Sequence, residues 1–413
     1  QITGTLPAIS AANLTNVPAA NITGTLPAID GSNLTGIGGT DFIHAEQISV
    51  SGVTTSQAFI PSQGQLSHRN ILINGDMNIA QRGTSSTSVG YQTCDRWYFA
   101  YGGENEAPTQ AQADLSSSDT PYSFGFRKSY KITNGNQTST DAADYLVFYT
   151  VIEAQDLAKC GWNYTSTSSY ITLSFWAKSS VTKTFDVKLT TNDGTAQQFN
   201  HKFALSANTW KKVEIPIPGN SNITINNDNG KGVEIQWDMY SGTNYTSGST
   251  VDQWVTYNGN TSAPDETDDW WTTNDATFEL TGVQLEVGQV ATPFEHRSFG
   301  EELDLCRRYC QVYASVGNYT RFGTTISQSS VSIRTIFYLK KQLRAVPTYS
   351  YSGSFQCPGA TNFDMANMAL ESSSTSTDII VLKQGSMSVN VNNAFFLAAD
   401  GDTSAKITFD SEL

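Results

Sequence analysis

The first forty residues repeat themselves, and this repeat limits what the chain can fold into. The octapeptide ITGTLPAI at 2–9 returns at 22–29, so the period is twenty residues. Aromatic side chains are absent from 1–40, and Asp30 is its only charged residue. Without bulky side chains the segment cannot fill a core, and proline at a fixed phase opposes helix formation. Repeats of this kind bury their apolar positions only against neighbouring repeats or other chains.

We therefore predict that 1–40 is a repetitive, extended shaft in which three chains share one axis. Three copies would cover the Ile and Leu positions and leave Thr and Asn outside. The alternative is a flexible Gly/Thr linker, which would not need the repeated octapeptide. The chain opens inside a repeat, at Gln1, so we expect it to be part of a longer protein. Residues 41–68 are predicted to be a transition segment.

The net charge excludes several classes of partner. The chain has 413 residues, a formal charge of −14 and a pI of about 4.7. An acidic surface repels phosphate backbones, so we expect no nucleic acid partner. No apolar run approaches ~18 residues, so we expect no membrane insertion.

The cysteines predict free thiols. Their number is five and their spacing irregular, which argues against a disulfide framework. Cys306 and Cys310 could form a metal-binding pair on a helix, but no second pair completes a site. We predict buried free thiols, no metal and no cofactor, and assembly in a reducing bacterial cytoplasm.

Residues 69–297 read as one all-β domain. Alternating apolar and polar residues predict strands, and turn-forming clusters such as NDG at 192–194 separate them. The predicted strands are 169–179, 184–193, 210–218, 231–242 and 276–288. Regular short strands without helical periodicity favour a jelly-roll β-sandwich.

One helix and a second β module follow. Ser298 precedes Glu301 by three residues, a capping-box pattern, so we predict a connecting helix over 298–313. Its apolar seam runs from Leu303 to Tyr313, and we expect it to pack near a trimer axis or against the sandwich base. Residues 314–413 are predicted to form a C-terminal β-sandwich tip, with strands at 331–339, 377–384 and 405–410.

Three stretches outside the repeat resemble a known family. NILINGDMNIAQRGTS at 70–85, with CDRWYF at 94–99, resembles the opening of a widespread phage tail-fibre domain. GVQLEVGQVATPFEHRSFGEELDLCRRYCQVY at 282–313 resembles its close, and LRAVPTYSYSG at 343–353 resembles the strand that follows. The repeated NLTNVPAANITGTLPAI pattern is also common in tail-fibre shafts. The middle of the domain, 100–275, is similar only in its strand pattern.

The resemblance implies a phage receptor-binding protein with a carbohydrate-binding-module-like jelly roll. Its first strand, at the Asn74-Gly75-Asp76 turn, would lie beside the last, Phe278–Val287. Related modules often hold a structural calcium with an acidic residue in the final strand. The matching position here is Thr281, which puts a calcium in doubt, and Asp76 and Glu279 are alternative oxygen donors.

Residues 237–271 contain the candidate ligand-binding side chains. Aromatic rings stack on pyranose faces, and nearby polar groups fix the hydroxyls. Trp237 lies in an alternating strand and is assigned to the core, although the other rings could also be core. The glycan-binding candidates are the loop residues Trp254, Tyr257, Trp270, Trp271, Asp268 and Asp269.

The expected function is attachment of a virion to its host by a tail fibre, without catalysis. The expected partners are two further copies of the chain, a host surface polysaccharide or lipopolysaccharide, and an upstream tail or adaptor protein bound through the N-terminal region. One alternative is a tail-spike depolymerase that uses the acidic cluster at 265–269, which also reads as a solvated loop. Another is a purely structural fibre segment.

Overall fold

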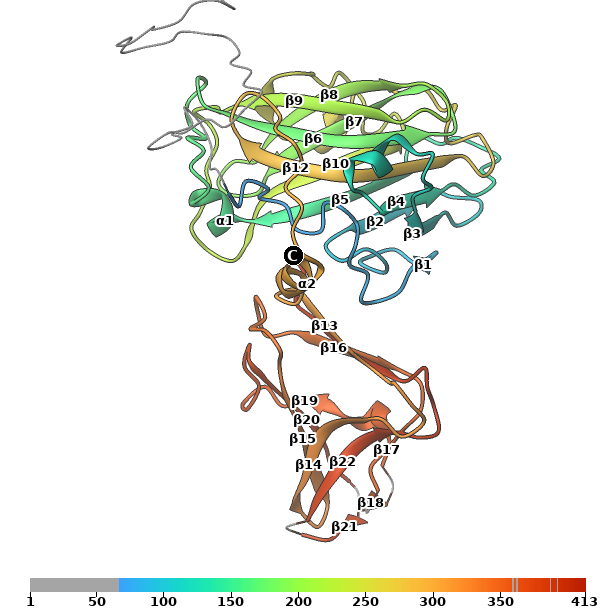
Figure 1. The fold of residues 1–413 in the computed structure, drawn as a ribbon, viewed down its shortest axis with the longest axis vertical. Helices are drawn as coiled ribbons and strands as arrows, with labels where there is room; N and C mark the ends of the chain where they lie inside the picture. Colours follow the sequence, from blue (N-terminus) through green and yellow to red (C-terminus); the bar gives the residue numbers. More distant parts are fainter. Residues whose placement is uncertain (1–66, 359, 362, 387, 392) are drawn as a thin grey trace, which may run out of the picture. The chain divides into compact units, whose positions relative to one another are not determined.

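The computed structural model describes residues 67–413, except 359, 362, 387 and 392. The predicted shaft at 1–40, and the transition segment up to residue 66, lie outside the described residues. The described part is almost entirely β-structure with two short α-helices (Figure 1), which confirms the predicted all-β class. No helix in this part is long and apolar enough to cross a membrane.

Two six-stranded antiparallel sheets form the large sandwich. The first has the order β1 (Ser85–Ser86), β3 (Thr109–Asp114), β4 (Lys128–Thr133), β12 (Thr277–Val287), β6 (Tyr170–Ser179) and β9 (Lys211–Pro218). The second has the order β11 (Trp254–Thr256), β8 (Gln197–Leu205), β7 (Lys183–Thr191), β10 (Lys231–Ser241), β5 (Tyr145–Glu153) and β2 (Tyr98–Gly102). Each of the five strands predicted between 169 and 288 is confirmed within two residues at either end.

The sandwich core is unusually rich in aromatic rings. Trp237 is fully buried, as predicted, and stacks on Phe148 with ring centroids 5.6 Å apart. Phe148 belongs to the second sheet. Its ring also contacts Phe278 on the first sheet and Trp97, which directly precedes β2. Such ring pairs add roughly 0.5–1.5 kcal/mol each beyond the area that they bury.

The Asn74-Gly75-Asp76 turn lies beside the last strand, as the resemblance implies. Val283 donates its backbone N–H to Gly75 O at 2.9 Å, and Ile71 donates to Leu285 O at 2.9 Å. A side chain at position 75 would place its Cβ 2.0 Å from Val283 O, so only glycine fits against this strand.

The predicted helix over 298–313 is half as long as expected. Helix α2 spans Phe299–Cys306, and Ser298 caps it by accepting a hydrogen bond from the Glu301 N–H at 3.3 Å. Cys310 already begins β13 (Cys310–Ala314), which pairs with β23 (Lys406–Asp410). The prediction of helix for 307–313 is therefore wrong, because pairing with a strand almost a hundred residues later outweighs the local helical pattern. Buried Glu302 accepts a hydrogen bond from the Asn74 N–H, so α2 packs against the base of the sandwich.

The C-terminal module is also a small sandwich, as predicted. Its first sheet has the order β13, β23 and β16 (Thr348–Ser352). The second has the order β17 (Phe355–Gln356), β22 (Ala394–Ala399), β14 (Arg321–Ser329), β15 (Ser332–Tyr338), β20 (Ile379–Gln384) and β19 (Ala369–Leu370). Strands β18 (Ala360–Thr361) and β21 (Ser388–Val389) form a separate pair. Ile407 and Phe409 from one sheet share a core with Leu382 and Leu397 from the other. The domain boundaries named from the sequence stay predictions.

A buried ionic network joins the module to the sandwich; we call it the junction. Arg96, only 2% exposed, forms an ion pair with Glu412 and places its guanidinium 3.4 Å from the centre of the Tyr309 ring. Arg82 pairs with Asp410 at 2.7 Å and with Glu412 at 3.2 Å. These residues come from the chain end and from two of the stretches that resemble the tail-fibre family.

Four of the five thiols are buried and the fifth is half-buried. Burial raises the pKa of Cys94, Cys306 and Cys310 well above the ordinary value of a thiol. All five are free, and no group of three or more His, Cys, Asp or Glu side chains among the described residues is arranged to hold a metal ion.

Candidate functional site

A large cavity lies on the outer face of the second sheet. Its floor comes from β5, β7 and β10, and its wall is the segment from Gly242 to Ala263. The volume is about 760 Å³, within the range of small-molecule sites. Three tyrosines, Tyr145, Tyr245 and Tyr257, line it together with Lys188 and Gln236. We call it the tyrosine pocket.

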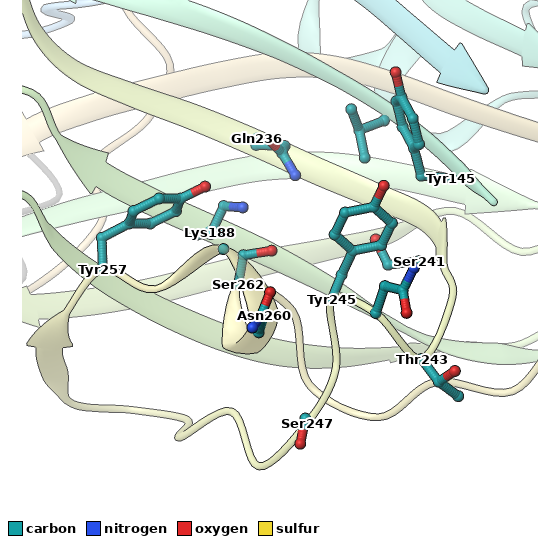
Figure 2. A pocket seen from close by; sticks show the side chains of 13 residues that line it. Tyr145, Lys188, Gln236, Ser241, Thr243, Tyr245, Ser247, Tyr257, Asn260 and Ser262 are labelled. Atoms are coloured by element: carbon teal, nitrogen blue, oxygen red, sulfur yellow. The ribbon is translucent and has the colours of Figure 1, made fainter. Parts of the chain in front are cut away.

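Strand alternation places the floor residues. Val187 and Leu189 point into the core, so Lys188 between them faces outward. Gln236 lies between the buried side chains of Ile235 and Trp237, and it is the register partner of Lys188 on the neighbouring strand. The two polar side chains therefore lie side by side at the bottom of the pocket (Figure 2).

The tyrosines flank this floor. Figure 2 shows Tyr257 on one side of Lys188 and Gln236, and Tyr145 and Tyr245 on the other. The rings of Tyr145 and Tyr245 meet edge to face, with centroids 5.9 Å apart. The Tyr257 ring centre lies 5.9 Å from the Lys188 ammonium nitrogen, and 41% of this residue is exposed. The pocket thus offers flat apolar faces around a polar floor.

Backbone hydrogen bonds hold the wall in place. Tyr257 donates its N–H to Ala196 O at 2.8 Å, and Ala263 donates to Tyr245 O at 3.0 Å. The Gln198 side chain donates to Thr261 O at 2.7 Å. A wall fixed in this way needs little ordering when a ligand binds, which favours affinity.

Beside the floor, on the same outer face of the sheet, lies a buried pair of carboxyl groups. Asp186 and Asp238 are register partners on β7 and β10, and both are fully buried. Asp238 accepts a hydrogen bond from the Gln236 amide at 2.7 Å, whereas neither Asp186 carboxyl oxygen has a partner among the described residues. Burial, followed by the charges of Asp238 and Glu266, raises the pKa of Asp186 well above its usual range. Two such carboxyl groups oppose each other's ionisation, which favours the protonated form of Asp186.

A buried ion pair lies just beyond the wall, where the chain continues past Ala263. Glu266 and Lys183 have no side-chain exposure, and their charged atoms lie 2.9 Å apart. Lys183 also donates to Met239 O at 2.6 Å. Burial is the largest influence on Glu266 and raises the pKa of its carboxyl group to about 7 despite this lysine.

Of the six side chains chosen from the sequence, only Tyr257 lines the tyrosine pocket. Asp268 and Asp269 are exposed and line a neighbouring cavity of about 510 Å³ that also includes Glu266. That cavity and the tyrosine pocket share only Ser241 and Thr243.

The three candidate tryptophans are corrected, because their rings offer no free face. Trp270 and Trp271 are fully buried, and their indole N–H groups donate to Thr277 O at 3.2 Å and Ser139 O at 3.1 Å. Trp254 is 9% exposed and donates to Pro218 O at 2.7 Å. A ring packed in the core with its N–H occupied cannot stack on a sugar.

The residues missed by sequence reasoning are Lys188, Gln236 and Tyr145. All three lie on strands and face outward. In the sequence, a polar or amphipathic residue at such a position looks like an ordinary solvent-exposed residue. Tyr245, Asn244 and Asn260 lie in the aromatic-rich stretch at 237–271 and do line the pocket. A signal for Lys188 and Gln236 existed only in the cross-strand register, which one sequence does not display.

The oxygen atoms considered for calcium are engaged by protein groups. The Thr281 hydroxyl donates to Lys128 O at 2.7 Å. Glu279 pairs with Lys178 at 2.9 Å and accepts from the Ser129 hydroxyl at 2.9 Å. Asp76 accepts hydrogen bonds from the backbone and side chain of Asn78.

Comparison with known proteins finds only weak likeness. No protein-family model matches the chain, and no curated protein matches it. Among solved structures, the enzymatically active domain of tailspike protein 4 from bacteriophage CBA120 matches with 12% identity and a TM-score of 0.29, over 53% of this chain and 21% of that chain. The N-terminal cellulose-binding domain of a Cellulomonas fimi β-1,4-glucanase matches with 9% identity and a TM-score of 0.25, over 52% of this chain and 99% of that domain. The family 11 carbohydrate-binding module of a Clostridium thermocellum cellulosomal cellulase matches with 11% identity and a TM-score of 0.25, over 52% of this chain and 98% of that module. Likeness at this level carries no argument about function.

Proposed function

We propose that this chain binds a glycan in the tyrosine pocket without cleaving it. The observation that carries the proposal is the composition of the pocket. Three tyrosine faces surround a floor of Lys188 and Gln236, and serine, threonine and asparagine side chains complete the lining. Pyranose rings present apolar faces to aromatic rings and hydroxyls to amides, hydroxyls and ammonium groups.

The same lining favours binding over hydrolysis. None of the described residues that line the tyrosine pocket is an Asp or a Glu. Glycoside hydrolysis requires two carboxyl groups beside the scissile bond, typically ~5–9.5 Å apart. The nearest such pair, Asp186 and Asp238, lies beside the floor but is fully buried, which closes it to a substrate in the pocket.

We further propose that glycan binding serves virion attachment by a phage tail fibre. This part rests on the three stretches that resemble tail-fibre proteins and on the repeat at 1–40. The proposed partners are two further copies of the chain, a host surface polysaccharide or lipopolysaccharide, and an upstream tail or adaptor protein. The proposed location is the virion, after assembly in the host cytoplasm.

A glycan array probed with the wild-type chain and two pocket variants tests the proposal. Tyr257→Ala removes one exposed stacking face, and Gln236→Ala removes the floor amide. We expect each variant to lose up to about tenfold in affinity for the best glycan, since an aromatic contact contributes about 0.5–1.5 kcal/mol and a hydrogen bond about as much. Tyr338→Ala removes another exposed tyrosine, 73% exposed on the C-terminal module, and should bind as the wild type does. Equal binding by all four proteins would remove the tyrosine pocket from the account.

Polysaccharide cleavage remains a second candidate because Glu266, Asp268 and Asp269 line the cavity of about 510 Å³ beside Tyr240. Release of reducing sugar from host envelope extract, lost in an Asp268→Asn or Asp269→Asn variant, would favour it over simple binding.

A further inference from the structure

A cavity of about 370 Å³ lies on the C-terminal module. It is formed where the turn before β14 meets β22 and β17. Tyr319, Arg321, Gln356 and Phe396 line it, and none of these residues takes part in the tyrosine pocket. Tyr319 is 66% exposed and Phe396 is 45% exposed, so both rings present faces to solvent.

Arg321 is the unusual residue in this cavity. Its guanidinium carbon lies 4.3 Å from the centre of the Phe396 ring, a cation–π geometry. The other nine arginines of the chain all donate to an oxygen atom of the protein. Within the described part of the chain, Arg321 alone has neither an ion pair nor a hydrogen-bonded acceptor. Its five N–H donors are therefore available to a ligand.

The surrounding backbone holds the aromatic faces in place. Thr320, between Tyr319 and Arg321, accepts hydrogen bonds at its hydroxyl from the Val316 and Gly317 N–H groups at 2.9 and 3.0 Å. Ala399 donates its N–H to Thr320 O at 2.9 Å, which ties this turn to the end of β22. The Phe396 ring orients the guanidinium, because stacking restricts the plane of its donor fork. The cavity is thus preformed around one free cation.

We propose that this cavity is a second site, specific for a sugar that carries a carboxylate. The guanidinium of Arg321 would take the carboxylate through two parallel hydrogen bonds. Tyr319 would stack on the apolar face of the same ring, and Gln356 lies within the cavity for a hydroxyl. In a chain with a net charge of −14, an unpaired arginine selects for an anion where the rest of the surface repels it. The site uses residues different from those of the proposed glycan pocket and does not depend on it.

Titration calorimetry with trigalacturonic acid and its fully methyl-esterified form tests the charge requirement. The two probes share rings and hydroxyls and differ only in the carboxylates. We expect the acid to bind the full chain at least about tenfold more tightly than the ester, because a bidentate carboxylate–arginine pair is lost with the ester. Equal affinities for acid and ester, or no binding of the acid, would overturn the proposal.

Variants locate the binding and separate it from the first site. Arg321→Gln should reduce affinity for the acid by about tenfold or more, and Arg321→Lys by less, since it keeps the charge but loses the fork. Arg127→Gln is the matched control. The Arg127 guanidinium carbon also lies over a ring, 3.9 Å from the centre of half-buried Tyr122, but this guanidinium already donates to Tyr122 O and Phe126 O. Tyr257→Ala should leave binding of the acid unchanged. Loss of that binding in Tyr257→Ala but not in Arg321→Gln would place the acid in the tyrosine pocket and refute the second site.

Discussion

At the scale of single residues, the region beside the tyrosine pocket combines ionisable groups whose side chains are buried from water. Asp186, Asp238 and Glu266 are carboxyl groups without side-chain exposure, and Lys183 and Lys188 are the cations beside them. Isolated burial of this kind is costly, so protonation of part of the set relieves it. The stability of the fold around Glu266 should therefore respond to pH.

Glu266→Gln should show this response in equilibrium unfolding. The folded-state pKa of Glu266, about 7, exceeds its value of about 4.5 in an unfolded chain. Because the folded protein retains a proton that the unfolded chain has lost, the stability contributed by this group falls as pH rises from ~4.5 to ~7. Relative to the wild type, Glu266→Gln should gain up to about 3 kcal/mol between pH 4.5 and pH 8. A stability difference that is constant over this range would contradict the raised pKa.

The limits of sequence reasoning are clearest at the same scale. Trp270 and Trp271 follow two aspartates and precede two threonines, so their local sequence is that of an exposed loop. Both rings nevertheless pack in the sandwich core, and the Asn134 side-chain amide donates to their backbone, to Trp270 O at 3.2 Å and to Trp271 O at 2.6 Å. A contact across more than a hundred residues leaves no local pattern. Tyr257 was found because its exposure follows from its immediate surroundings.

At the scale of elements, strand positions were predictable and the end of the helix was not. Alternation marks β6, β7, β9, β10 and β12 because each buries one face in a single core. Helix α2 was recognised at Ser298, where the cap is a local interaction. Its end at Cys306 depends on β23, since Ser411 donates its N–H to Tyr309 O at 2.8 Å and β23 pairs with β13 from Cys310 onward. Local signals thus located the start of this element and non-local pairing set its end.

The junction gives the chain end a structural role that can be measured. Glu412→Ala leaves Arg96 buried and unpaired, and removing one partner of a buried ion pair typically costs about 3–5 kcal/mol. We expect a loss of that size in the free energy of unfolding, from denaturant titration. Glu214→Ala is the matched control, because the Lys212–Glu214 pair is 37% and 45% exposed and should cost less than about 1 kcal/mol. Equal losses in the two variants would mean that the junction adds nothing special to stability.

At the scale of the whole molecule, the stretches that resemble tail-fibre proteins and the residues of the tyrosine pocket are separate. Residues 70–85, 94–99 and 282–313 supply the Asn74-Gly75-Asp76 turn beside β12, the helix α2 and part of the junction. The tyrosine pocket lies between 145 and 262, where the chain is similar to tail-fibre domains only in strand pattern. The resemblance therefore proposes a class of protein and does not locate the pocket. The repeat at 1–40 predicts partner chains and likewise does not locate the pocket.

The mass of the full chain in solution tests the proposed assembly. If three copies share the shaft predicted for 1–40, light scattering should give three times the 44.9 kDa of one chain. A monomer at micromolar concentration would rule out the shared shaft.

The central claim is that a glycan binds in the tyrosine pocket, and the position of a bound glycan tests it most directly. A crystal structure of the chain with the best oligosaccharide from the array should show a sugar ring stacked on Tyr257, with a hydroxyl within hydrogen-bonding distance of Gln236. A glycan bound elsewhere on the sandwich, with Tyr257 and Gln236 free of contact, would contradict the account.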